Sequence, residues 1–205
     1  VIRNEAQCFA PTSLAVSLAT KHQAILHVLH ISTAEELALF NSSQPLTDKK
    51  ITAEVCVHHL WYDSRDYEKL GAQIKCNPAI KEERHKVQLL QALLDNKLDV
   101  IATDHAPHLW QEKYALTPDG KPDYFKSPSG LPLLQHSFNM MLEFYRQGKL
   151  SLEKIAEKMC HAPALLFKIK NRGFIREGYA ADLFLLDAEQ QYTISKENIL
   201  YKCNW

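Results

Sequence analysis

Short apolar runs and helix-like patterns alternate along this chain. Four runs have the length and apolar character of buried strands, and they cover residues 24–31, 51–57, 73–76 and 100–103. Apolar residues at helical spacing predict helices over 11–22, 34–40, 81–96, 133–147 and 151–159. Strands and helices that repeat with short connections are typical of a parallel sheet, either open or closed into a barrel.

The pattern changes after the last predicted strand. A long loop over 113–130 precedes the last helices, and the tail at 173–187 alternates in the manner of β structure between glycines. We therefore predict an α/β domain over residues 1–170 and part of a small β domain over residues 171–205. The chain opens at Val1 without a methionine, a strand or a capping residue, so we expect it to begin within a longer protein.

Composition excludes several classes of protein. The 205 residues are 46% hydrophobic, which is enough for a sizeable core. Lys plus Arg and Asp plus Glu number 24 each, so no net charge attracts nucleic acid. No apolar run reaches the roughly 18 residues that span a bilayer, and no signal pattern opens the chain. The five cysteines are scattered without a C-x-x-C motif, which predicts a reducing, cytoplasmic setting.

Polar side chains suited to metals or substrates follow the predicted strands. In parallel β/α folds all carboxyl ends of the strands lie on one face, so distant residues meet there. The sequence therefore predicts a reaction site at this face. The residues concerned are His30, His58, His59, Asn77 and the segment 104–108, which contains Asp104 and His108.

His30 and Asp104 each admit two interpretations. His30 is either a metal ligand or a histidine that caps a strand by bonding a backbone carbonyl. Asp104 is either a functional carboxylate or a turn or N-cap residue, and the neighbouring histidines favour function. Strand alternation places His27 on the face opposite His30, so the two should not form a ligand pair.

The other candidates carry weaker signals. Adjacent strand residues face opposite sides, so at most one of His58 and His59 should point into a site. Asn77 before a proline is also a common turn residue. Cys76 has no evident base and is better interpreted as a small buried hydrophobe than as a nucleophile.

Four motifs, in this order, resemble the dihydroorotase family of the amidohydrolase superfamily, which acts in pyrimidine synthesis. They are HVLHIST (27–33), ITAEVCVHHL (51–60), CNPAIK (76–81) and TDHAPH (103–108), of which the last is the most specific. The tail GFIREGYAADLFLLD (173–187) also resembles the small β domain of that superfamily. The resemblance implies an α/β fold, namely the C-terminal portion of a (β/α)8 TIM-type barrel followed by part of a small β-sandwich domain.

The resemblance also implies a zinc-dependent cyclic amidohydrolase that interconverts dihydroorotate and N-carbamoylaspartate with one or two zinc ions. It makes His30 a zinc ligand, and Asp104 both a zinc ligand and the general base. Asn77 and His108 become binders of the substrate carboxylate. Backbone contacts to the pyrimidine ring would come from the segment 128–131, with Pro128, Gly130 and Leu131 as the named residues.

The resemblance covers only the C-terminal half of the family enzyme. The family's H-x-H pair is absent from this sequence, and so are its early substrate-binding Arg, its bridging carboxylated Lys and a further His. We therefore expect the N-terminal half of the same barrel as a partner, a homodimer as the assembly, and no activity from these residues alone. The alternatives are a cyclic amidohydrolase of the hydantoinase or allantoinase type, and a noncatalytic scaffold or partner-binding subunit. Ala79 and Lys81 depart from the usual family pattern, whereas the predicted ligands follow it.

Overall fold

A parallel sheet forms the centre of the computed structural model, which describes residues 4–120 and 123–205. Within these residues the strands are β1 (Leu26–Val28), β2 (Ile51–Cys56) and β3 (Val100–Ala102), in the order β1-β2-β3. Leu26 pairs with Ile51, and Glu54 pairs with Val100. The parallel sheet predicted from the strand-helix pattern is confirmed in these three strands.

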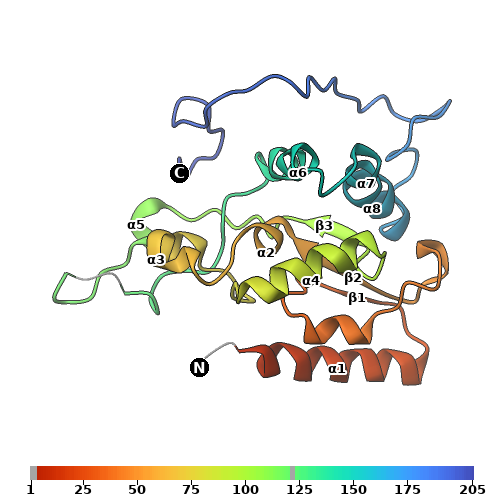
Figure 1. Cartoon of the computed structure of the whole chain (residues 1–205), viewed down its shortest axis with the longest axis horizontal. Helices are drawn as coiled ribbons and strands as arrows, with labels where there is room; N and C mark the ends of the chain where they lie inside the picture. Colours follow the sequence, from red (N-terminus) through yellow and green to blue (C-terminus); the bar gives the residue numbers. More distant parts are fainter. Residues whose placement is uncertain (1–3, 121–122) are drawn as a thin grey trace.

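Helices cover the sheet on the sides of both β1 and β3. Figure 1 shows α1 (Glu5–His22) beside β1, and α6 (Ser137–Arg146), α7 (Leu152–Ala156) and α8 (Ala162–Leu166) on the other side of the sheet. The helix α4 (Glu83–Leu94) packs on the short helix α2 (Val57–Trp61) that follows β2. The remaining helices are α3 (Asp66–Leu70), α5 (Trp110–Lys113), the 3-10 helices η1 (Glu35–Leu39), η2 (Leu46–Asp48) and η3 (Gly71–Ile74), and the π-helical turn η4 (Glu157–His161).

The predicted strand at 73–76 is wrong. The chain there forms η3, which begins at Gly71 with a φ of 50° and turns away from the sheet. A strand forms only where a neighbouring strand supplies a ladder of hydrogen bonds. The structure assigns no strand here, although the Lys75 carbonyl accepts from the Gly130 N–H at 2.8 Å. Asn77 therefore follows a 3-10 helix and not a strand.

The two faces of β2 have different chemistry. Ala53 and Val55 are fully buried in an apolar cluster with residues from α2, α4 and α6, such as Leu60, Leu93 and Met141. Burying a side chain of the size of valine or leucine contributes about 1.5–3 kcal/mol. The alternate residues of the strand, Thr52, Glu54 and Cys56, point to the opposite face and are also buried. This polar row is unusual inside a fold and needs partners.

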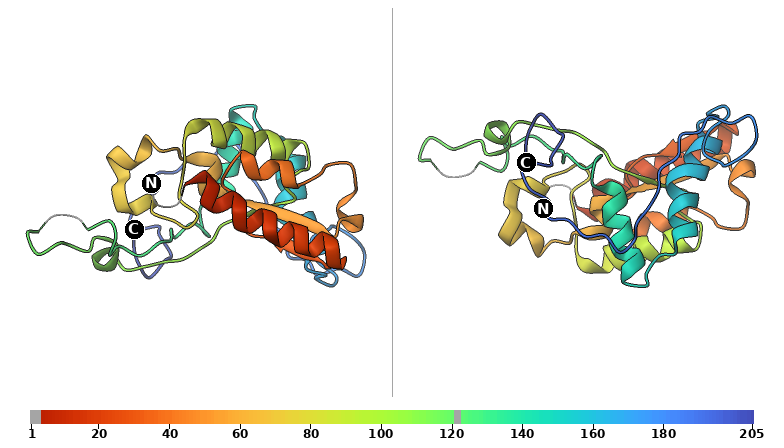
Figure 2. Two further views of the ribbon diagram at one scale, coloured as in Figure 1. Left: turned by 90° about the horizontal axis from the view of Figure 1, so that it is seen from below. Right: turned by 90° about the horizontal axis from the view of Figure 1, so that it is seen from above.

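The tail does not form the small sheet predicted over 173–187. The structure assigns no strand to these residues, and Leu183, Phe184 and Leu185 are exposed. The tail runs over α6 to α8 (Figures 1 and 2) and is bonded to α6, where the Arg146 guanidinium donates to the Ala188 carbonyl at 2.7 Å. An alternating pattern becomes a strand only beside another strand, and the tail lies beside helices. The domain division at residue 170 stays a prediction.

None of the described helices is a candidate for a membrane-spanning segment. No helix within residues 4–120 and 123–205 is both long enough and apolar enough to cross a bilayer.

Candidate active site

His30 and Asp104 lie together at the carboxyl edge of the sheet. His30 follows β1 and Asp104 follows β3, and the His30 Nε2 lies 3.5 Å from the Asp104 Oδ1. Both residues have left-handed backbone, with φ of 57° and 45°. This conformation is uncommon for residues other than glycine, and residues held in it cluster at functional sites among other places. The fold thus holds these two side chains face to face at the expense of local backbone strain.

Glu54 in β2 holds the imidazole of His30 in position. Its Oε1 lies 2.8 Å from the His30 Nδ1, and its Oε2 lies 3.0 Å from the His27 Nε2. Burial alone would raise the pKa of Glu54, but the hydrogen bonds from His27 and His30 outweigh burial and hold that pKa at about 2. Glu54 is therefore ionised at neutral pH. It binds the Nδ1 of His30 and leaves the Nε2 directed at Asp104.

The prediction that His27 points away from His30 is wrong. Alternation of side chains applies within an extended strand, and β1 ends at Val28, before His30 is reached. The left-handed backbone at His30 turns its ring toward Glu54, so both imidazoles contact one carboxylate. Glu54 was not identified from the sequence, although a carboxylate inside the apolar run ITAEVCV was a usable signal.

The donor atoms of His30 and Asp104 fit a zinc ion. Ligand atoms that share one zinc ion each lie about 2.0–2.2 Å from it, so a separation of 3.5 Å between Nε2 and Oδ1 allows both to reach the same ion. A histidine that ligates a metal usually donates its other ring N–H to a carboxylate, which is the arrangement of His30 and Glu54. Catalytic zinc sites usually have three protein ligands. Within the described residues, no cluster of three potential ligands includes Asp104.

Replacement of Glu54 by Gln is expected to weaken zinc binding at His30 by about 10- to 100-fold, because an amide orients the imidazole but no longer increases its basicity. The measurement is a zinc titration against a chromophoric chelator. Only the zinc binding that is lost in His30→Ala is counted as binding at this site. Glu82→Gln changes an exposed carboxylate and is the matched control. Unchanged affinity in Glu54→Gln would show that the charge of this carboxylate does not strengthen His30 as a ligand.

Asn77 lies on the wall of a cavity that also reaches His30. The cavity has a volume of about 320 Å³ and is open to solvent beside α1 and the end of β1. Its other lining residues include Thr12, Leu29 and Glu36. The structure therefore places Asn77 in the same cavity wall as His30, even though the strand predicted before it is absent.

His108 lies against the segment 128–131. Its Nε2 is 3.1 Å from the Ser129 carbonyl oxygen. Gly130 has a φ of 137°, and a Cβ at this position would lie only 2.5 Å from the Ala106 Cβ, so no other residue fits without displacement of the chain. The Ala106 N–H donates to the Leu131 carbonyl at 3.1 Å. The loop after β3 and the predicted ring-binding segment, which begins at Pro128, therefore form one packed unit.

Two buried lysines bond this region, and sequence reasoning missed both: Lys113 bonds the segment 128–131, and Lys75 bonds the loop just before it. Lys113 is fully buried, and its ammonium donates to the carbonyls of Lys75, Pro128 and Gly130 at 3.0, 3.0 and 2.7 Å. The Lys75 ammonium donates to the Tyr124 carbonyl at 2.6 Å. Burial lowers the pKa of Lys113 to about 8. These lysines satisfy carbonyls that a loop without secondary structure would otherwise leave unpaired.

His58 and His59 are both buried, and the prediction that at most one of them points into a site stays a prediction. They lie in the helix α2 and not in a strand, so alternation does not separate them, and their ring centroids are 4.3 Å apart. Burial lowers the pKa of both imidazoles, to about 3 for His59. Cys76 is also fully buried, and burial raises its thiol pKa to about 12, as expected for an unreactive cysteine.

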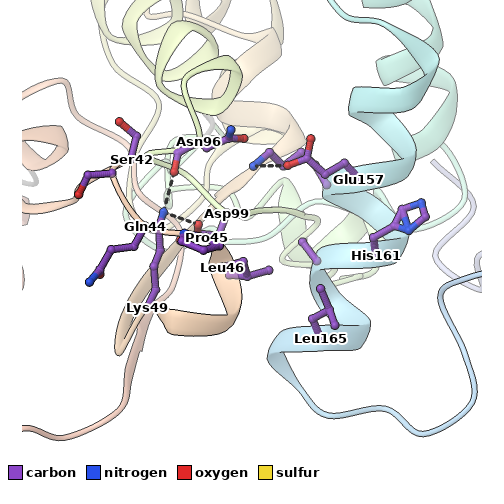
Figure 3. A pocket seen from close by; sticks show the side chains of 13 residues that line it. Ser42, Gln44, Pro45, Leu46, Lys49, Asn96, Asp99, Glu157, His161 and Leu165 are labelled. Atoms are coloured by element: carbon purple, nitrogen blue, oxygen red, sulfur yellow. Dashed lines mark hydrogen bonds and ion pairs between the residues drawn. The ribbon is translucent and has the colours of Figure 1, made fainter.

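A further pocket lies at the opposite, amino-terminal end of the strands. Figure 3 shows it between the loop before β2, which contributes Lys49, and η4, which contributes Glu157 and His161. Its most buried charges are already paired, since the Lys49 ammonium lies 2.7 Å from Asp99 Oδ1 and the Asp99 Oδ2 accepts from the Ala53 N–H at 3.0 Å. In barrels of this type such groups serve stability, because reactions take place at the carboxyl ends.

The structure combines a parallel β/α fold with polar side chains that meet at the carboxyl ends of the strands. The model of the Amidohydrolase family matches residues 13–202. The chain therefore belongs to the amidohydrolase family, and its fold is of the TIM-barrel α/β type.

Several similar proteins are dihydroorotases. The dihydroorotase of Methanosphaera stadtmanae is 31% identical over 191 residues, and that of Carboxydothermus hydrogenoformans is 33% identical over 188 residues. These alignments cover 93% and 91% of this chain but only 42% of each relative. The chain thus spans less than half the length of these relatives, and the resemblance to dihydroorotase inferred from the motifs is confirmed.

Solved structures of cyclic amidohydrolases share the fold. The L-hydantoinase of Arthrobacter aurescens superposes with a TM-score of 0.80 and 26% identity, over 91% of this chain and 41% of that enzyme. The D-hydantoinase of a Thermus species gives a TM-score of 0.84 at 22% identity, over 95% of this chain and 43% of that enzyme, which bears on the fold alone.

Proposed function

We propose that this chain is the metal-binding C-terminal part of a dihydroorotase, which opens and closes a cyclic amide between dihydroorotate and N-carbamoylaspartate. The observation that carries the proposal is the His30–Asp104 pair, 3.5 Å apart, with Glu54 behind the imidazole. The dihydroorotase names of the relatives support the choice of substrate. Zinc, as one or two ions, is the proposed cofactor.

Asp104 has the central part in the proposed mechanism. Zinc in such sites supplies acidification of water and polarisation of a carbonyl group. The Asp104 carboxylate takes the proton from the attacking water and returns it to the leaving ring nitrogen, which is the role of a positioned general acid and base. His30 holds its Nε2 toward the same position because Glu54 fixes its Nδ1. In the reverse direction the same carboxylate removes a proton from the attacking nitrogen.

Substrate recognition is proposed for the groups around the site. Asn77 and His108 would donate hydrogen bonds to the substrate carboxylate, and hydrogen bonds to a charged group contribute about 1.5–3 kcal/mol each. Backbone groups of the segment 128–131, from Pro128 to Leu131, would contact the pyrimidine ring. The packing of Gly130 on Ala106 supports this role, since it holds the segment beside His108.

The remaining parts of the site are proposed to come from a preceding half-barrel. His30 and Asp104 are two ligands where three are usual. The strand β1 also has an open edge in the sheet order, and Ile25 and Leu29 near it are exposed. A barrel buries such an edge by pairing it with another strand. We further propose a homodimer in the cytoplasm, with the tail over 171–205 as part of the small β domain of the complete enzyme.

A second candidate is a hydantoinase-type cyclic amidohydrolase, which the likeness to the Arthrobacter aurescens L-hydantoinase favours. The two candidates differ in the substrate carboxylate, which dihydroorotate has and hydantoin lacks. Asn77 and His108 are the groups proposed to recognise it. A noncatalytic scaffold is the remaining alternative.

The proposal is tested by measuring turnover of three compounds: N-carbamoylaspartate, hydantoin and allantoin. Turnover by the chain with added zinc is measured before and after a matching N-terminal half-barrel is supplied. We expect no turnover by the chain alone, because its metal site is incomplete, and turnover of N-carbamoylaspartate by the assembled protein. Preference for hydantoin or allantoin would favour the second candidate. Zinc binding without turnover of any of the three compounds would favour the scaffold.

A further inference from the structure

A second cluster of potential metal ligands lies at the start of α2. The Cys56 thiol and the imidazoles of His58 and His59 offer ligand atoms that all lie within 4.8 Å of one another. Cys56 and His58 are fully buried, and His59 is 4% exposed. This cluster consists of residues that the proposed dihydroorotase mechanism does not use.

Three ring nitrogens in this cluster have no hydrogen-bond partner among the described residues. They are both nitrogens of His58 and the Nδ1 of His59. The other nitrogen of His59, Nε2, lies 2.9 Å from the Pro78 carbonyl oxygen, which can only accept, so Nε2 carries the proton. The Nδ1 of His59 therefore presents a lone pair. A buried polar group without a partner costs about 1–3 kcal/mol, and native proteins contain few of them.

We propose that Cys56, His58 and His59 bind a thiophilic metal ion of the zinc type, at a site distinct from the His30–Asp104 pair. Thiolate and imidazole are ligand types that zinc takes in proteins, and three protein ligands leave the fourth position of the ion open. Binding forms a sulfur-metal bond and two nitrogen-metal bonds, and the Cys56 thiol releases its proton to solvent. The ion takes up the lone pairs that the fold leaves buried and unpaired. This inference does not depend on the proposed dihydroorotase activity.

His30 is the competing partner for Cys56. The Cys56 Sγ lies 3.2 Å from the His30 Nδ1, and His30, Glu54 and Cys56 form another cluster of possible ligands. That nitrogen, however, already bonds the Glu54 carboxylate at 2.8 Å, whereas the nitrogens of His58 bond nothing in the described structure. The unpaired lone pairs therefore favour His58 and His59 as the companions of Cys56.

Cobalt substitution separates the two sets of ligands, because a thiolate bound to Co²⁺ gives a charge-transfer absorption band and a site without sulfur does not. The experiment titrates Co²⁺ into the purified 205-residue chain under a phosphine reductant. We expect the band in the unchanged chain and in His30→Ala, and its loss in Cys56→Ser and His58→Leu. Cys203→Ser removes another buried thiol and is the matched control, with the band retained.

Thermal unfolding shows whether the variants are folded. His58→Leu keeps an apolar side chain of similar size and removes two unpaired nitrogens, so the metal-free variant should unfold at the same temperature as the unchanged chain or higher. The rise in unfolding temperature that Zn²⁺ causes should be smaller in His58→Leu than in Cys203→Ser. Absence of the band in the unchanged chain, its persistence in folded His58→Leu, or its loss in folded His30→Ala would each overturn the proposal.

Discussion

Asp104→Asn is expected to lower the turnover of N-carbamoylaspartate by the assembled enzyme by about 100- to 10,000-fold, the usual contribution of a positioned general acid and base. The amide keeps the shape of the side chain but cannot accept the proton. It is also a weaker ligand than a carboxylate, so the zinc content should fall as well. The measurement is steady-state turnover together with metal analysis of the same preparation.

The control for this prediction is Asp48→Asn, which neutralises an exposed carboxylate at the end of η2. It should leave turnover and zinc content unchanged. If Asp104→Asn retained full turnover, Asp104 could not be the proton-transfer group, and the His30–Asp104 pair would lose its place in the proposed mechanism.

Lys113→Met is expected to destabilise the chain by about 3 kcal/mol or more. The methionine fills much of the same space, but the carbonyls of Pro128 and Gly130 lose the ammonium that now bonds them, whereas the Lys75 carbonyl keeps its bond from the Gly130 N–H. Each buried acceptor that loses its partner costs about 1–3 kcal/mol. The measurement is the free energy of unfolding from urea denaturation, followed by the fluorescence of the tryptophans.

Lys126→Met is the matched control, because the Lys126 side chain is 64% exposed and lies in the loop that follows Lys113. A surface substitution of this kind should change the free energy of unfolding by no more than about 0.5 kcal/mol. Equal effects of the two substitutions would show that Lys113 does not hold the segment 128–131.

The sequence alone was sufficient for the parts of the fold that depend on local pattern. The apolar runs at 51–57 and 100–103 correspond to β2 and β3, and the helical spacing at 81–96 corresponds to α4. Both features arise from neighbouring residues along the chain, since strand and helix each repeat with a fixed period. The parallel arrangement followed from their alternation, and it led to the expectation that His30 and Asp104 meet at one edge.

The sequence could not show which strand-like segments lie beside another strand in the fold. The run at 73–76 and the tail at 173–187 have the residues of strands, yet neither forms one. A strand exists only through hydrogen bonds to another strand, and whether one lies alongside depends on the whole fold. The predicted orientation of His27 was wrong for a related reason. Side-chain alternation ends where β1 ends, and the left-handed backbone at His30 follows from the tertiary structure.

The partners of the buried polar groups were decided by the tertiary structure alone. Glu54 and His30 are 24 residues apart in sequence, and the Lys113 ammonium and the Lys75 carbonyl are 38 apart. A carboxylate or an ammonium group is tolerated inside a protein only where the fold brings complementary atoms to it, and no local period encodes that encounter. The sequence by itself thus determined the elements, the family resemblance and the candidate ligands His30 and Asp104. Only the packed chain determined that Glu54 orients the first of these and that Lys113 holds the segment 128–131. It also determined that both nitrogens of His58 and the Nδ1 of His59 are buried beside Cys56 without a hydrogen-bond partner in the described structure.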